Sequence, residues 1–140
     1  MKSIKNKFMQ INCIILIILT MLSICGCTKN NMEDTMKNSY NQISMAEAKL
    51  IMENEEDIII LDVRTESEYY EGHIPQAINI PNENIKSEEI AELPDKEQKI
   101  LVYCRSGNRS KQAAQKLAEL GYSNIYEFGG IMDWDGEIEK

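Results

Sequence analysis

The residues with the clearest chemical potential stand together in one short loop, Cys104 to Ser110, with the sequence CRSGNRS. An apolar run precedes the loop and a helical pattern follows it, so its backbone N–H groups and the helix N-terminus can face a bound anion. A cysteine at the head of such a loop is expected to have a lowered pKa and to react as a thiolate. Arg105 and Arg109 add positive charge, and Gly107 allows a backbone conformation that a side chain would obstruct. The alternative is a buried, inert cysteine, which the polar sequence of the loop disfavours.

Four apolar runs predict the strands that position this loop. They cover residues 58–63, 77–80, 100–103 and 125–128. The first and third are continuous, as is typical of strands buried on both faces of a parallel sheet. Helical patterns alternate with them, so the predicted class is α/β with a mostly parallel sheet. The cysteine loop then lies at the carboxyl edge of the sheet, where such folds place their sites.

The predicted helices cover residues 45–52, 65–71, 85–93 and 110–120. The first begins with the capping-box pattern of Ser44 and Glu47. The second is capped by Thr65 or Ser67 and stopped by Gly72. The third has the weakest helical pattern, whereas the fourth, directly after the cysteine loop, has a clear apolar face.

Three further motifs accompany the cysteine loop: LDVR at 61–64, EYYEGHIPQAINIP at 68–81, and Gly129-Gly130 with Trp134. Together and in this order, the four motifs resemble a single-domain rhodanese (thiosulfate sulfurtransferase-like), and the resemblance covers residues 42–136. It implies a rhodanese-like α/β fold, with a mostly parallel central sheet flanked by helices on both faces. The notable departure is Gln76, where the family usually has glycine; it lies in a turn outside the cysteine loop.

The resemblance implies that Cys104 attacks a sulfane donor such as thiosulfate, carries the sulfur as a persulfide, and passes it to a thiol or cyanide. The substrate-binding residues that it implies are Arg105, Ser106, Gly107, Asn108 and Arg109. Asp62 and Arg64 are expected to support the loop through hydrogen bonds and an ion pair, with Glu68 as a candidate partner. His73 is expected to be a hydrogen-bonded turn residue rather than a general base, and Trp134 a packing residue near the site.

The nearest alternative of related architecture is a phosphatase or arsenate reductase, whose arginine stands six places after the cysteine. Ser110 holds that place in this chain, and Arg109 comes one residue earlier. The shorter loop predicts a pocket sized for a sulfur atom rather than a tetrahedral phosphate. The domain has one histidine and one cysteine, too few to assemble a set of soft ligands, so neither a metal site nor a cofactor is expected.

Composition narrows the function further. The chain has 140 residues, of which 43% are hydrophobic and 27% charged, as is ordinary for a globular protein and not for a disordered or fibrous one. With 15 basic and 23 acidic side chains, the net charge is −8, so nucleic acid is not an expected partner. The length suits one domain.

The N-terminus predicts an export signal. Three lysines precede an apolar run over residues 13–24, which is shorter than the roughly 20 residues that a membrane-spanning helix needs. The segment Ile24-Cys25-Gly26-Cys27 resembles the bacterial lipobox, which implies cleavage before Cys27 and a diacylglyceryl thioether on its sulfur. Two acyl chains suffice for stable anchoring. The alternative is an uncleaved signal anchor over residues 8–27.

The predicted organisation is a lipoprotein signal peptide (1–26), a lipidated Cys27 with a flexible polar tether (27–41), and a rhodanese domain (42–140). An alternative for the tether is a segment packed on the domain through Tyr40. The protein is then expected at the extracytoplasmic face of the cell membrane, with small sulfur-containing anions and an external thiol or thiol protein as partners. The alternative function is a noncatalytic module that binds a partner or senses sulfane sulfur or oxidant. The intact Cys104 and both loop arginines favour the enzyme.

Overall fold

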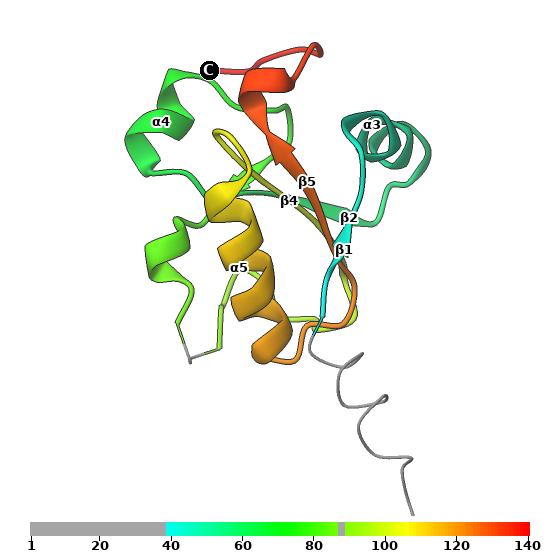
Figure 1. Ribbon diagram of the computed structural model, residues 1–140, viewed down its shortest axis with the longest axis vertical. Coiled ribbons are helices and arrows are strands. Elements are labelled where there is room, and N and C mark those ends of the chain that lie inside the picture. Colours follow the sequence, from blue (N-terminus) through cyan, green and yellow to red (C-terminus); the bar gives the residue numbers. More distant parts are fainter. Residues whose placement is uncertain (1–38, 87–88) are drawn as a thin grey trace, which may run out of the picture. The chain divides into compact units, whose positions relative to one another are not determined.

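The computed structural model describes residues 39–86 and 89–140, which form one parallel five-stranded sheet in the order β1-β5-β4-β2-β3 (Figure 1). The strands are β1 (Asn41–Gln42), β2 (Ile58–Asp62), β3 (Ile78–Asn79), β4 (Lys99–Cys104) and β5 (Ile125–Gly130). The helices are α3 (Met45–Asn54), α4 (Glu66–Glu71) and α5 (Asn108–Glu119), with 3-10 turns η1 (Asn82–Asn84) and η2 (Ile131–Asp133). The predicted α/β class with a parallel sheet is confirmed.

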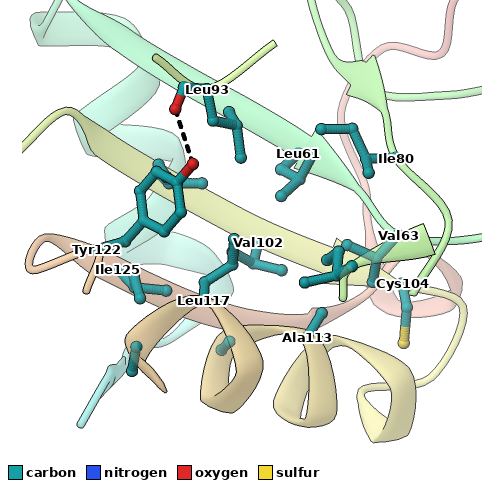
Figure 2. Close-up of a cluster of buried hydrophobic side chains, with 14 residues drawn as sticks. Leu61, Val63, Ile80, Leu93, Val102, Cys104, Ala113, Leu117, Tyr122 and Ile125 are labelled. Carbon is teal, nitrogen blue, oxygen red and sulfur yellow. Dashed lines mark hydrogen bonds between the residues drawn. The ribbon is translucent and has the colours of Figure 1, made fainter. Parts of the chain in front are cut away.

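The sheet buries both of its faces. Alternate strand residues point to a cluster shared with α5, which includes Leu61, Val102 and Leu117, and Figure 2 shows this cluster between sheet and helix. The intervening residues, among them Leu101, point to a second cluster on the α3 side, which includes Ala48. Figure 1 shows α5 and α3 on opposite sides of the sheet, as the predicted helices on both faces require.

Two local capping motifs begin the helices on either side of β2. Ser44 and Glu47 exchange hydrogen bonds at the start of α3, and Thr65 and Glu68 do the same at the start of α4. Each side-chain oxygen satisfies a backbone N–H that the first helical turn leaves without a partner. The predicted caps are confirmed, with Thr65 rather than Ser67 in the second, and Gly72 follows α4 at a φ of 153°.

The helix predicted over residues 85–93 is wrong. The described residues of this segment, 85–86 and 89–93, contain no helix, and η1 lies just before them. Ile85 and Leu93 are both buried in the cluster on the α5 side, and the Leu93 carbonyl accepts the Tyr122 hydroxyl at 2.7 Å (Figure 2). The apolar side chains Ile85 and Ile90 are five residues apart, a spacing that does not place them on one helical face.

The first described strand, β1, pairs with β5 at the edge of the sheet. Tyr40, just before it, packs against the cluster on the α5 side. At the end of the predicted tether, Tyr40 and Asn41 thus pack on the domain, as the alternative for the tether has it for Tyr40. The predicted signal peptide, lipidation at Cys27 and most of the tether lie outside the described residues. Among the described residues, no helix has the length and apolar character needed to cross a membrane.

Candidate active site

Cys104 is the last residue of β4 and lies at the carboxyl edge of the sheet, as predicted. Its side chain closes one end of the cluster on the α5 side and is 1% exposed, and Figure 2 shows its sulfur near the first turn of α5. The backbone N–H of Gly107 donates a hydrogen bond to Sγ at 3.1 Å. The cysteine is therefore buried, as the inert alternative requires, but its sulfur faces the polar loop.

The backbone of Gly107 turns the loop toward the sulfur. Its φ is +97°, a left-handed conformation that side chains disfavour, and α5 begins at the next residue. The end of β5 closes the loop from the other side, because a Cβ built on Gly130 would lie 2.3 Å from the Arg105 carbonyl oxygen. Glycine at these two positions lets strand, loop and helix meet around Sγ.

Two opposing influences act on the pKa of the Cys104 thiol. Burial raises the pKa and is the largest single influence. Hydrogen bonds from the Ser110 hydroxyl and from the backbone N–H groups of Ser110, Ser106 and Gly107 together outweigh burial, so the pKa lies below its usual value. The direction agrees with the expected thiolate at the head of this loop.

The two loop arginines differ in their surroundings. Arg109 donates two hydrogen bonds to Glu68, from Nη1 at 2.7 Å and from Nη2 at 2.8 Å, and so ties the start of α5 to α4. This ion pair holds the pKa of Glu68 at about 2. Arg105 is exposed and, in the described part of the chain, has no ion-pair partner. Arg105 therefore offers its charge outward, whereas the charge of Arg109 is already compensated.

Asp62 and Arg64 form a buried ion pair with each other, at 2.6 Å between Oδ2 and Nη2. Arg64 also donates to the carbonyl of Gly72 at 2.7 Å, and the Asn79 amide donates to the carbonyls of Asp62 and Arg64. These contacts connect the end of β2 to the turn after α4 and to β3. The candidate partner Glu68 pairs instead with Arg109, so the ion pair of Asp62 and Arg64 braces the sheet edge.

His73 and Trp134 have structural contacts. His73 is buried, its Nδ1 lies 3.0 Å from the Tyr69 carbonyl, and its ring stacks on Tyr69 with 3.7 Å between centroids. Trp134 packs against the α3-side cluster near Phe128, with 6.5 Å between their rings. His73 has the structural role expected from the sequence, and Trp134 is a packing residue as expected, but it packs on the cluster across the sheet from the one that contains Cys104. Gln76, where the family usually has glycine, keeps a glycine-like φ of 65°.

Sequence reasoning missed two residues beneath the loop. Ser110 lies in the first turn of α5, and its hydroxyl donates to the Glu127 carboxylate at 2.6 Å. Glu127, on β5, is only 3% exposed. The signal in the sequence was a carboxylate two residues after Ile125, on the same face of an otherwise apolar strand. A charged residue at a core-facing position is unusual enough to mark a site.

The comparisons with known proteins identify one family. The model of the rhodanese-like domain family matches residues 44–137. Thiosulfate sulfurtransferase GlpE of Coxiella burnetii is 40% identical over 96 residues, which are 68% of this chain and 87% of that protein. Thiosulfate sulfurtransferase PspE of Escherichia coli is 38% identical over 73 residues, 52% of this chain and 70% of that protein.

Solved structures show the same fold. The BH2092 protein of Bacillus halodurans has a TM-score of 0.63 at 34% identity, over 76% of this chain and 82% of that one. A structure described as rhodanese with anions from E. coli has a TM-score of 0.54 at 37% identity, over 59% of this chain and 96% of that one. With the cysteine loop, the parallel sheet and these relatives in agreement, the chain belongs to the rhodanese-like domain family.

Proposed function

We propose that this protein is a sulfurtransferase that moves sulfane sulfur from thiosulfate or a persulfide donor to a thiol or cyanide, through a persulfide on Cys104. The observation that carries the proposal is the hydrogen bond from the Gly107 N–H to Sγ at 3.1 Å, within a loop that lowers the pKa of Cys104. The names of the relatives GlpE and PspE, both thiosulfate sulfurtransferases, support the same reaction.

The proposed cycle has two balanced steps. The Cys104 thiolate attacks the outer sulfur of thiosulfate; a new S–S bond forms, the old one breaks, and sulfite leaves with its electron pair. An acceptor thiolate or cyanide then attacks the outer sulfur of the persulfide, and the Cys104 thiolate leaves. Exposed Arg105 attracts the anionic donor, and the loop N–H groups stabilise negative charge on sulfur.

Mass spectrometry of the intact protein tests this proposal. After thiosulfate treatment we expect the mass of one added sulfur atom, which cyanide then removes. The Cys104→Ser variant should show neither change, because oxygen cannot carry sulfane sulfur. Aryl phosphate hydrolysis, the reaction of the longer-loop alternative, should be negligible. An unchanged mass in wild type would contradict the proposal and favour the noncatalytic module.

We also propose that Cys27 is lipidated and anchors the domain at the outer face of the cell membrane. The lipobox-like Ile24-Cys25-Gly26-Cys27 supports this. Processing would remove Cys13 and Cys25 and convert the Cys27 sulfur to a thioether, leaving Cys104 as the free thiol. The sulfur acceptor must then be another molecule, a small thiol or a thiol protein.

Fractionation of cells tests the anchor. A Cys27→Ser variant should leave the membrane fraction or accumulate as uncleaved precursor. Cys25→Ser is the matched control, because that residue does not carry the lipid and its replacement should keep the protein in the membrane fraction. Normal processing and membrane attachment of the Cys27→Ser variant would favour the uncleaved signal anchor.

A further inference from the structure

Glu127 is a buried carboxylate beneath the cysteine loop. Its Oε1 accepts hydrogen bonds from the Ser110 hydroxyl at 2.6 Å and the Gly129 N–H at 3.0 Å, and its Oε2 accepts one from Gln42 at 3.2 Å. Within the described part of the chain, no lysine, arginine or histidine forms an ion pair with it. Burying a carboxylate without a cation is costly. Because no cation neutralises Glu127, its negative charge acts on the polar groups around it.

Ser110 connects this carboxylate to the reactive sulfur. Its one hydroxyl proton has several acceptors: Glu127 at 2.6 Å, the Gly107 carbonyl at 2.9 Å and the Gly129 carbonyl at 3.3 Å. Gly107, whose carbonyl accepts from Ser110, also donates its N–H to Sγ of Cys104 at 3.1 Å, so Ser110 joins the carboxylate to the backbone that holds the sulfur. A Ser110 hydroxyl that donated to the thiolate instead would lower the pKa of Cys104. The contact with Glu127 is the shortest and is charge-assisted, so the carboxylate draws the proton away from sulfur.

The other charged or titratable groups near Cys104 do not supply the influence that we assign to Glu127. From the side of β1, Tyr40 feels the charge of Glu127: burial raises the pKa of the phenol most, and the carboxylate raises it further. From α5, Arg109 acts on Cys104, but its charge is compensated by Glu68. The neighbouring strand places the apolar Val102 opposite Glu127. Among the described residues, Asp62 is buried with Arg64 as its partner, so Glu127 is the buried carboxylate without a cation, and its charge opposes the loop N–H groups.

We propose that Glu127 is a positioning residue that, through Ser110, sets the balance between attack and release of sulfur at Cys104. This inference rests on the proposed sulfur transfer. A thiolate of very low pKa leaves readily but attacks poorly, since nucleophilicity falls with pKa. The carboxylate limits how far the loop lowers the pKa of Cys104, and so preserves attack on the donor at the expense of release to the acceptor.

The Glu127→Gln variant tests the inference by measuring the two half-reactions separately. Removing the charge should lower the pKa of Cys104 by about one pH unit, read from the pH dependence of alkylation by iodoacetamide. At a pH above the thiol pKa, persulfide formation from thiosulfate should slow by about threefold. Release of the sulfur to cyanide should accelerate by about threefold.

Controls separate this role from a structural one. Glu119→Gln removes an exposed carboxylate at the far end of α5 and should change neither half-reaction. Glu127→Asp keeps the charge but withdraws the oxygen from Ser110. Like Glu127→Gln, it should slow persulfide formation and accelerate sulfur release, each by a smaller factor. This variant also serves if Glu127→Gln does not fold, which circular dichroism would show.

Two results would overturn the inference: an alkylation pKa that stays or rises, or half-reactions that both slow in parallel. Alkylation requires no sulfur transfer. If wild type forms no persulfide while Glu127→Gln still lowers the alkylation pKa, the proposed function fails and the influence of Glu127 on Cys104 stands.

Discussion

Helices α3 and α4 begin with the same local motif and have different tertiary partners. In α3 the Ser44–Glu47 box is exposed, and the nearby Lys49 pairs with Asp135 at the surface. In α4 the Thr65–Glu68 box has a third partner, Arg109, 41 residues along the chain. One carboxylate thus caps a helix and also holds the first turn of α5, in the loop that follows Cys104. The difference shows that a local cap becomes part of the candidate active site only when the fold brings a loop against it.

Of the variants that compare the two helices, Arg109→Ala should cause the largest fall in kcat/KM. The substitution removes the bidentate link between α4 and the cysteine loop and leaves the Glu68 carboxylate without its cation. Loss of a charge-assisted pair of this kind costs about 2 kcal/mol, so kcat/KM for thiosulfate should fall by roughly 30-fold. Steady-state assays with cyanide as acceptor measure it.

Lys49→Ala is the matched control on the α3 side, because it also breaks an ion pair of a helix with a distant residue. Its kcat/KM should remain within a factor of about two of wild type, as is usual for an exposed pair. Equal losses in the two variants would show that the link from α4 has no special relation to the site.

Glu68→Gln and Glu47→Gln compare the carboxylates of the two boxes directly. Glu68→Gln should lower kcat/KM about fivefold and the free energy of unfolding by about 1 kcal/mol, because the charge of a partly exposed ion pair is lost while glutamine still accepts hydrogen bonds from Arg109 and at the cap. Glu47→Gln should leave kcat/KM unchanged. Urea unfolding and sulfur-transfer assays on the same samples measure both quantities, and a slowed Glu47→Gln variant would contradict the comparison.

Acid should remove the contribution of Glu68 to the free energy of unfolding in a pH range set by its two pKa values. Its pKa is about 2 in the folded protein and 4.5 ordinarily, because the Arg109 hydrogen bonds favour the charged form. The stabilisation is therefore complete above pH 4.5 and is lost as the pH falls toward 2. The gap in unfolding free energy between wild type and Glu68→Gln should narrow across that range in urea titrations. A gap that stays constant would mean that the ion pair does not stabilise the fold.

The smallest difference is expected between Ser44→Ala and Thr65→Ala. Each removes the hydroxyl that accepts a backbone N–H at an N-cap, and each should cost about 1 kcal/mol in unfolding free energy. Because these hydroxyls act locally, the two costs should agree and sulfur transfer should change little in either variant. A large rate loss in Thr65→Ala alone would show that the position of Glu68 depends on Thr65.

Much of the fold was predictable because its causes are local. The caps of α3 and α4 join residues three apart, and the buried strands β2 and β4 are continuous apolar runs. The position of Cys104 at the sheet edge follows from its place between a strand and a helix. The predicted helix over 85–93 failed because Ile85 and Leu93 enter the core from described residues that form no helix, and the five-residue spacing of Ile85 and Ile90 does not suit one helical face.

The order of motifs by itself determined the fold class and the cysteine loop, since neighbouring residues fix turns, caps and strands. Tertiary structure alone decided the pairing of Glu68 with Arg109 and the place of Glu127 beneath Ser110. These partners are 41 and 17 residues apart in the chain. Such contacts depend on which strands become neighbours in the sheet and on the register between them. An ion pair or a shared proton forms only after the packing of the whole domain has brought its two groups within reach.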